Sequence, residues 1–242
     1  MKLSNKEFIK ISEAALAYYP KELCGIISEG IFIQITNIHE EPEKHFTLCP
    51  IELAEHLDKI EAVVHSHTKT IRTTELFDLR TPSYADIVGQ KQTGIPWLIV
   101  GTEGVNVSRP LEIPRVRNNN YLERPFIWYI NDCYSLVQDF YWFELGIDLP
   151  DHKAEKNFEN IRKEHSLFEK YISEYGFIEL SAFSELQEGD LVLLDTGGRV
   201  KNHLGIYTNG FILHQAALSI KEEAYHFTGR THKVLRHVSK SI

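Results

Sequence analysis

Cys133 is the residue of this chain that is best placed to act as a nucleophile. It follows Asp132, which can cap a helix, so the cysteine is expected in the first helical turn. Unpaired backbone N–H groups and the helix dipole both favour the reactive thiolate there. His203 and His214 lie on two strands that are expected to pair, so one imidazole can act as the base while the other orients it. These residues predict nucleophilic catalysis.

Simpler interpretations of the same residues remain open. A single cysteine in a helix is more often an apolar core residue, and a single histidine in a strand is more often structural. The chain has three cysteines, at positions 24, 49 and 133, which are too few for a disulfide framework and lack metal-clip spacing.

A second group of residues has the pattern of a zinc site. His65 and His67 end a buried strand, and alternate residues of a strand point to the same side. The two imidazoles could bind one zinc ion, with Asp86 as the third ligand and water as the fourth. Glu22 could be the general base that accepts the proton of this water. The alternatives are an H-x-H pair without metal and a plain helix cap, because Ser83 and Asp86 also have the spacing of a capping box.

Helices alternate with strands in the first half of the chain, as in an α/β layer. Ser4 and Glu7 have the spacing of a capping box, so a helix is predicted to begin at Ser4 and to end at Pro20. Further helices are predicted at Pro50–Ile60 and Ser83–Gln92, and strands at Leu23–Ile27, Ile31–Ile35, Ala62–His65 and Trp97–Gly101.

Residues 102–124 contain prolines and three successive asparagines, a composition typical of a linker. We therefore expect two domains, at residues 1–110 and 111–242. In the second domain a helix is predicted to start at Asp132, and 151–175 has a helical pattern. Strands are predicted at Leu191–Leu194, His203–Tyr207 and Phe211–His214, the last two joined by an Asn-Gly hairpin turn. One helix followed by a small antiparallel sheet predicts an α+β class.

The overall composition excludes some classes of function. The formal net charge of -8 argues against a nucleic-acid binder, which needs a concentrated basic face. No apolar run has the length of a membrane span, and the N-terminus lacks the apolar stretch of a secretion signal. We therefore expect no membrane insertion and a protein that stays in a cytosol unless another particle carries it out.

Three motifs of the second half resemble those of the NlpC-type cell-wall peptidases. Residues 132–137 (DCYSLV) resemble the nucleophile motif, and residues 186–191 (LQEGDL) resemble a strand-entry motif with glutamate in place of the usual proline. Residues 202–207 (NHLGIY) resemble the motif of the catalytic histidine, and His214 falls at the third catalytic position. The resemblance covers about 115–242. It implies a papain-like α+β fold that hydrolyses peptidoglycan stem peptides, typically at D-γ-glutamyl-diaminopimelate bonds.

The first half, over roughly residues 1–105, resembles the JAMM (Mov34-type) metalloproteases. The matching segments are residues 20–25 (PKELCG), 65–67 (HSH) and 83–86 (SYAD). The resemblance implies an α/β/α domain that contains zinc. It assigns the base to Glu22, the metal ligands to His65, His67 and Asp86, and an oxyanion donor to Ser83.

Two features depart from the JAMM pattern. Thr68 stands where the family usually has proline, and the fifteen residues between His67 and Ser83 form a longer gap than usual. The extra residues are either a flap over the site or a sign that the site is not held in catalytic geometry.

A JAMM-like half followed by an NlpC-like half is the arrangement of a family of tail tip assembly proteins of lambda-like siphophages. This resemblance covers nearly the whole chain. It implies that the protein contacts peptidoglycan stem peptides and other tail tip proteins. It also implies a location in the host cytoplasm during assembly and at the virion tail tip, acting in the periplasm. The alternative is a structural assembly protein in which one or both peptidase sites are vestigial. An isopeptidase that acts on ubiquitin-like tags is a more distant alternative, because the NlpC-like half has no role in it.

Overall fold

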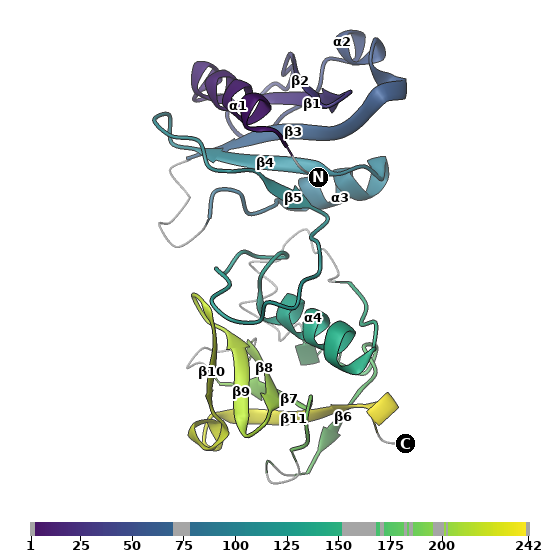
Figure 1. Ribbon diagram of the computed structural model, residues 1–242, viewed down its shortest axis with the longest axis vertical. Helices are drawn as coiled ribbons and strands as arrows, with labels where there is room; N and C mark the ends of the chain where they lie inside the picture. The colour runs from purple at the N-terminus through teal and green to yellow at the C-terminus, as the bar shows by residue number, and fades with distance from the viewer. Residues whose placement is uncertain are drawn as a thin grey trace. The chain divides into compact units, whose positions relative to one another are not determined.

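The computed structural model describes residues 3–69, 78–151, 168–169, 172–181, 183, 186–195, 201 and 203–240. The chain divides into two compact units, residues 1–116 and 117–242. Each unit has one sheet and few helices, so the class is α+β (Figure 1). Among the described helices, none is both long enough and apolar enough to cross a membrane.

The N-terminal unit is built on a five-stranded mixed sheet with the order β2-β1-β3-β4-β5. Strands β3 and β4 are parallel, and the other neighbours are antiparallel. Strand β5 lies within the segment predicted as a linker, so this unit extends beyond the predicted boundary at residue 110. The strands span Cys24–Ser28 (β1), Ile31–Ile35 (β2), Ile60–Thr68 (β3), Trp97–Thr102 (β4) and Leu111–Ile113 (β5).

Two helices cover opposite faces of this sheet (Figure 1). From α1, Ile11 packs in a core cluster with Val64 and Leu98. The neighbouring strand residues point to the other face, where α3 lies so close to Trp97 that any side chain at Gly89 would overlap the indole ring. The helices of this unit span Asn5–Tyr18 (α1), Pro50–Ala54 (α2) and Tyr84–Thr93 (α3).

The helix predicted at 50–60 is shorter than expected. It ends at Ala54, a 3-10 turn follows, and β3 already begins at Ile60. The apolar side chains of Ile51 and Leu57 are 80% and 62% exposed. No packing therefore stabilises a longer helix here, and short helices need such packing.

The first turn of α1 also differs in part from the prediction. Ser4 caps the helix as expected, because its Oγ accepts a hydrogen bond from the backbone N–H of Glu7 at 3.2 Å. The Glu7 carboxylate instead accepts from the backbone N–H of Phe32 at 2.7 Å, which ties α1 to β2.

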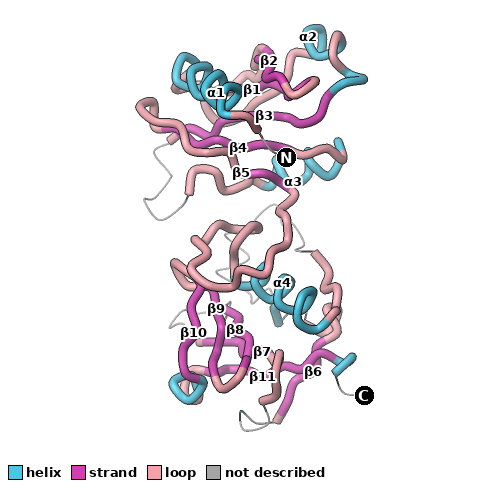
Figure 2. Tube along the Cα trace, in the orientation of Figure 1, coloured by secondary structure: helices cyan, strands magenta, loops and turns pink. Residues whose placement is uncertain are grey.

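The C-terminal unit contains α4 (Cys133–Leu145) and a six-stranded antiparallel sheet with the order β10-β9-β8-β7-β11-β6 (Figure 2). Residues 152–167 and 170–171, most of the segment predicted as a charged helix, lie outside the described residues. The strands span Phe177–Leu180 (β6), Leu191–Leu194 (β7), His203–Thr208 (β8), Phe211–Gln215 (β9), Ser219–Glu223 (β10) and Thr231–His237 (β11).

The predicted hairpin joins β8 to β9. Asn209 and Gly210 have φ angles of 51° and 85°, as a two-residue turn of type I′ requires, and such turns match the twist of the paired strands. The register that follows places Gly205 opposite His214. Helix α4 covers the face of this sheet to which Leu204, Ile206 and Leu213 point.

Candidate active sites

Strand β3 and helix α3 bring three polar side chains of the N-terminal unit together. His65 and His67 lie on the same side of β3, and Asp86 lies in the first turn of α3. The Nε2 atoms of the two histidines are 3.1 Å apart. Asp86 Oδ1 lies 3.1 Å from His65 Nε2, and Asp86 Oδ2 lies 3.2 Å from His67 Nε2. These three side chains could hold a metal ion.

The separations fit a tetrahedral zinc site. Zn–N and Zn–O bonds of about 2.0–2.1 Å place neighbouring tetrahedral ligands roughly 3.3 Å apart. The Nε2–Nε2 separation of 3.1 Å is close to this value, and so are the separations of 3.1 and 3.2 Å from the two nitrogens to the two oxygens of Asp86.

Hydrogen atoms alone cannot satisfy this triangle of contacts. If both Nε2 atoms of His65 and His67 carry hydrogen, two donors face each other. If only one does, the other nitrogen turns a lone pair toward the Asp86 carboxylate. At least one contact therefore stays repulsive unless a cation lies between the three groups.

The surroundings of the two imidazoles differ. His67 Nδ1 lies 2.8 Å from the carbonyl oxygen of Leu79, which can only accept. Nδ1 must therefore carry the hydrogen, and Nε2 of the neutral ring is free to bind a metal. The His65 ring stacks on Phe46 at 4.5 Å, and its buried Nδ1 has no hydrogen-bond partner among the described residues.

Asp86 takes part in the helix cap as well as in this cluster. The backbone N–H of Ser83 donates to Asp86 Oδ2 at 2.7 Å, and the backbone N–H of Asp86 donates to Ser83 Oγ at 3.2 Å. The helix-cap and metal-ligand interpretations are therefore compatible. Thr68 continues β3, and its hydroxyl donates to the carbonyl of Glu43 at 3.1 Å. Residues 70–77 of the long segment that follows lie outside the described residues.

Glu22 is buried close enough to this cluster for its charge to interact with it. Burial raises the pKa of Glu22 to about 7, His67 lowers it, and Asp86 raises it further. Burial also raises the pKa of Asp86, but His65 and His67 outweigh burial and hold that pKa below its ordinary value. Near neutral pH, Glu22 is thus a carboxyl group that can accept or release a proton.

Cys133 is the first residue of α4, as predicted, and the helix is firmly capped. The backbone N–H of Ser135 donates to Asp132 Oδ1 at 2.8 Å, and the backbone N–H of Asp132 donates to Ser135 Oγ at 2.7 Å. The prediction of a lowered thiol pKa is wrong. Burial and the Asp132 charge raise the pKa of Cys133 to about 12, although the backbone N–H groups of Leu204, Cys133 and Tyr134 lower it. With only 5% of the residue exposed, desolvation exceeds the effect of the helix start.

The two histidines of the hairpin are in contact. His203 Nε2 lies 2.9 Å from His214 Nδ1. His214 Nε2 in turn lies 2.9 Å from Oε1 of Glu222, on the next strand. Burial, followed by the nearby His214 and Arg230 charges, lowers the pKa of His203 to about 4, so this ring is neutral at physiological pH and can accept a proton.

Cys133 contacts β8 through the backbone of Leu204, the residue that follows His203. His203 and His214 lie on the face of the sheet away from α4, where the His214 ring contacts Phe227 at 5.4 Å. Leu204 follows His203 and lies one residue beyond the last β8–β9 pair, and its backbone N–H acts on the Cys133 thiol. The contact between Cys133 and Leu204, the residue after His203, therefore places the cysteine beside the strand that carries His203 of the two-histidine pair.

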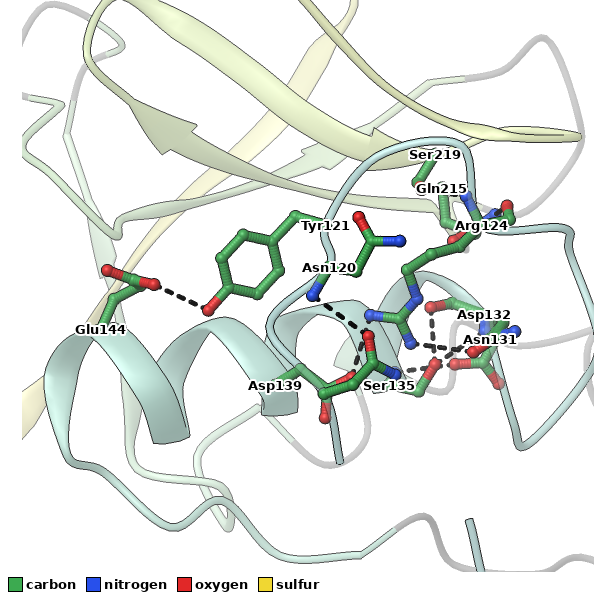
Figure 3. A network of polar contacts seen from close by, with 11 residues as sticks. Asn120, Tyr121, Arg124, Asn131, Asp132, Ser135, Asp139, Glu144, Gln215 and Ser219 are labelled. Carbon is green, nitrogen blue, oxygen red and sulfur yellow. Dashed lines mark hydrogen bonds and ion pairs between the residues drawn. The ribbon is translucent and has the colours of Figure 1, made fainter. Parts of the chain in front are cut away.

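A buried polar network ties the segment before α4 to the sheet (Figure 3). Arg124 lies 2.9 Å from the Asp139 carboxylate on α4, and the two side chains are 4% and 0% exposed. The Arg124 backbone also accepts from the Gln215 amide at 2.7 Å and from the Ser219 N–H at 3.1 Å. Tyr121 Oη donates to Glu144 at 2.8 Å near the far end of α4.

Sequence reasoning missed several residues of these sites. Glu222 was missed because β10 was not predicted, and the Leu79 carbonyl carries no signal in the side-chain sequence. Phe46, which stacks on His65, stands outside every predicted element.

The C-terminal unit combines a helix that begins with a cysteine and an antiparallel sheet in which two histidines are in contact. A comparison with known protein families identifies the class. Residues 123–238 match the NlpC/P60 family. This match confirms the resemblance of the C-terminal half to NlpC-type peptidases.

The similarity to a named relative extends across both units. The chain is 30% identical over 220 residues to "Tail tip assembly protein K" of Escherichia phage N15, covering 87% of this chain and 84% of that protein. The chain therefore belongs to the family of tail tip assembly protein K. The JAMM-like character of the N-terminal unit stays a prediction and is argued below as a proposal.

Proposed function

We propose that this protein is a tail tip peptidase that hydrolyses amide bonds of peptidoglycan stem peptides. Cys133 is the nucleophile, His203 the base and His214 the residue that orients the base. The observation that carries the proposal is the 2.9 Å contact between His203 Nε2 and His214 Nδ1. Because Nε2 of His203 is hydrogen-bonded to His214, Nδ1 is the ring nitrogen of His203 that is left to accept the thiol proton.

The raised thiol pKa favours general-base catalysis over a preformed ion pair. His203 Nδ1 accepts the proton as Cys133 Sγ attacks the amide carbon, and the backbone N–H groups at the start of α4 can stabilise the oxyanion. Collapse breaks the C–N bond, and the proton on His203 passes to the leaving amine. Water then attacks the thioester, with His203 again as the base, which releases the acid and restores the thiol.

Digestion of purified sacculi by the full-length protein tests this function. Cys133→Ala is expected to lower the rate of muropeptide release by about 10⁴-fold or more, because removal of a nucleophile costs orders of magnitude. Cys49→Ala, which removes a cysteine in the other unit, is the matched control and should retain activity. Equal digestion by Cys133→Ala and wild type would refute the mechanism, and the masses of the fragments identify the bond.

We also propose that the N-terminal unit binds one zinc ion through His65, His67 and Asp86. The observation that supports it is the triangle of contacts that hydrogen atoms cannot satisfy. A bound zinc ion would supply an acidified water and a Lewis acid. Glu22, with its pKa raised to about 7, would accept the proton, and Ser83 would donate to an oxyanion.

Metal analysis of the purified full-length protein tests the zinc site. We expect one zinc per chain in the wild type and in His45→Ala, which removes an exposed histidine of the same unit, and none in His67→Ala. Zinc bound equally by His67→Ala would place the metal elsewhere. Absence of zinc from the wild type would leave Ser83 and Asp86 as a helix cap.

The relative's name supports assembly partners among the other tail tip proteins. On this proposal the protein is in the host cytoplasm during assembly and at the virion tail tip afterwards, where it acts in the periplasm. A purely structural assembly role is the second candidate. The raised pKa of the Cys133 thiol favours it, and so does Thr68, which stands where JAMM proteases usually have proline. Phages that carry Cys133→Ala separate the two. Intact tails that fail to inject support the peptidase, whereas full infectivity supports the structural role.

A further inference from the structure

Glu222 extends the histidine pair by one more strand. Strand β10 pairs with β9 so that Ile220 lies opposite His214, and Glu222 is two residues further along on the same side. Its Oε1 lies 2.9 Å from His214 Nε2. In the same way, His203 is the diagonal neighbour of His214, because Gly205 is the residue directly opposite. The three side chains form a line across β8, β9 and β10.

We propose that Glu222 is a positioning residue that fixes the tautomers of both histidines and thereby makes His203 a base. An ionised carboxylate can only accept, so His214 Nε2 must carry the hydrogen. In a neutral ring His214 Nδ1 is then an acceptor, and His203 must donate to it from Nε2. The lone pair of His203 is left on Nδ1, the atom that faces neither His214 nor Glu222.

The opposite arrangement would disable the site. If His214 carried its hydrogen on Nδ1, His203 Nε2 would have to accept it. His203 Nδ1 would then hold a hydrogen and could not take the thiol proton. A wrong tautomer in a catalytic histidine costs about 10⁴-fold. Loss of a residue that hydrogen-bonds to a metal-bound histidine costs about 10- to 100-fold, and we expect a loss of that order at Glu222. This inference rests on the proposed function for its effect on rate, but not for its effect on tautomers.

Three variants of the full-length chain give graded predictions. In Glu222→Gln the side chain can either accept or donate, so both tautomers are expected and kcat should fall about 10- to 100-fold with little change in KM. In Glu222→Lys the side chain can only donate, so the inactive tautomer should prevail and the loss should be larger. Glu223→Gln removes the same charge from an exposed neighbour on the same strand and should behave as wild type.

The readout is the ¹⁵N chemical shift of the labelled histidine rings, which distinguishes Nδ1–H from Nε2–H. The resonances are assigned by comparison with His203→Gln and His214→Gln. We expect Nε2–H for His203 in the wild type and in Glu223→Gln, and a shift toward Nδ1–H in the two Glu222 variants. Nδ1–H in the wild type, or an unchanged tautomer in Glu222→Gln whatever its kcat, would overturn the inference. If the wild type shows Nε2–H and the Glu222 variants shift toward Nδ1–H, but the wild type has no peptidase activity, the inference stands and the proposed function is refuted.

Discussion

The two candidate sites differ in how their polar atoms are arranged. In the N-terminal unit, His65, His67 and Asp86 converge on one point, and two of them come from a single strand. In the C-terminal unit, His203 and His214 lie along a line that crosses neighbouring strands and ends at a carboxylate. A convergent set suits a cation between its members, whereas a line of donors and acceptors suits the ordering of protons. Similar residue types therefore support different chemistry in the two units.

Burial shifts the pKa of one group at each site, upward in the N-terminal unit and downward in the C-terminal unit. It raises the pKa of Glu22 to about 7 and lowers the pKa of His203 to about 4. In both cases the uncharged form is favoured, as desolvation requires. The result is a carboxyl group that titrates near neutrality in one unit and a neutral imidazole in the other.

The largest expected effect tests which histidine of the C-terminal unit is the base and which one orients it. His203→Ala should lower kcat/KM on muropeptides by about 10⁴-fold, because it removes the base. His214→Ala should cost less, about 10²-fold. His214→Asn should cost least, since an amide oxygen can still accept from His203 Nε2. His226→Ala, an exposed histidine of the same unit, serves as the control. If His214→Ala were the more damaging variant, the two roles would have to be exchanged.

The second prediction concerns the thiol. With its pKa raised to about 12, Cys133 should react with an alkylating reagent about ten-fold faster for each pH unit from neutrality to about pH 10, without levelling off. The rate is measured by mass spectrometry in a variant with Cys24 and Cys49 replaced by alanine. An inflection below about pH 8.5, the value of a free thiol, would show that the helix start outweighs burial.

The third prediction concerns the buried ion pair that stabilises the C-terminal unit. The C-terminal site joins segments far apart in sequence. The buried pair of Arg124 and Asp139 connects the segment before α4 to α4 itself. Asp139→Asn should destabilise this unit by about 3–5 kcal/mol, because a buried guanidinium loses its counter-charge. Asp148→Asn breaks the exposed pair with Arg117 and should cost less than about 1 kcal/mol.

Urea unfolding measures both variants through the two tryptophans of this unit, in a background where Trp97 is replaced by phenylalanine. Equal losses for Asp139→Asn and Asp148→Asn would mean that the buried pair does not hold the site together.

The sequence predicts the parts of each site that follow a local rule. The H-x-H pair lies on one strand, and Asp86 follows Ser83 at capping-box spacing, so the three candidate ligands can be found without knowing the fold. The hairpin with His203 is predictable because Asn209 and Gly210 define its turn. These rules depend only on residues that are close together along the chain.

Other parts depend on packing that the sequence does not display. Strand β10 is largely exposed and has the sequence SIKEE, without the alternation that marks a half-buried strand. Strand β11, with two buried residues among seven, was missed for the same reason. Without β10, Glu222 looked like one more surface charge. The pKa of Cys133 was mispredicted because local position indicates the helix start but not the depth of burial.

The smallest expected effect tests whether the helix cap and the metal site can be separated. Ser83→Ala removes the Oγ that accepts from the Asp86 N–H, and loss of an N-cap typically costs about 1 kcal/mol. The contact that holds the Asp86 carboxylate comes from the Ser83 backbone N–H at 2.7 Å and survives the substitution. Zinc content should therefore stay at one per chain while the free energy of unfolding falls. Ser12→Ala, within α1, is the control and should not destabilise the protein, since its hydroxyl only donates back to the Phe8 carbonyl. Unfolding is followed through Trp97 with the other two tryptophans replaced by phenylalanine, and zinc is measured on the same samples. Loss of zinc from Ser83→Ala would show that the hydroxyl itself holds Asp86 in place, and that cap and metal site form one unit.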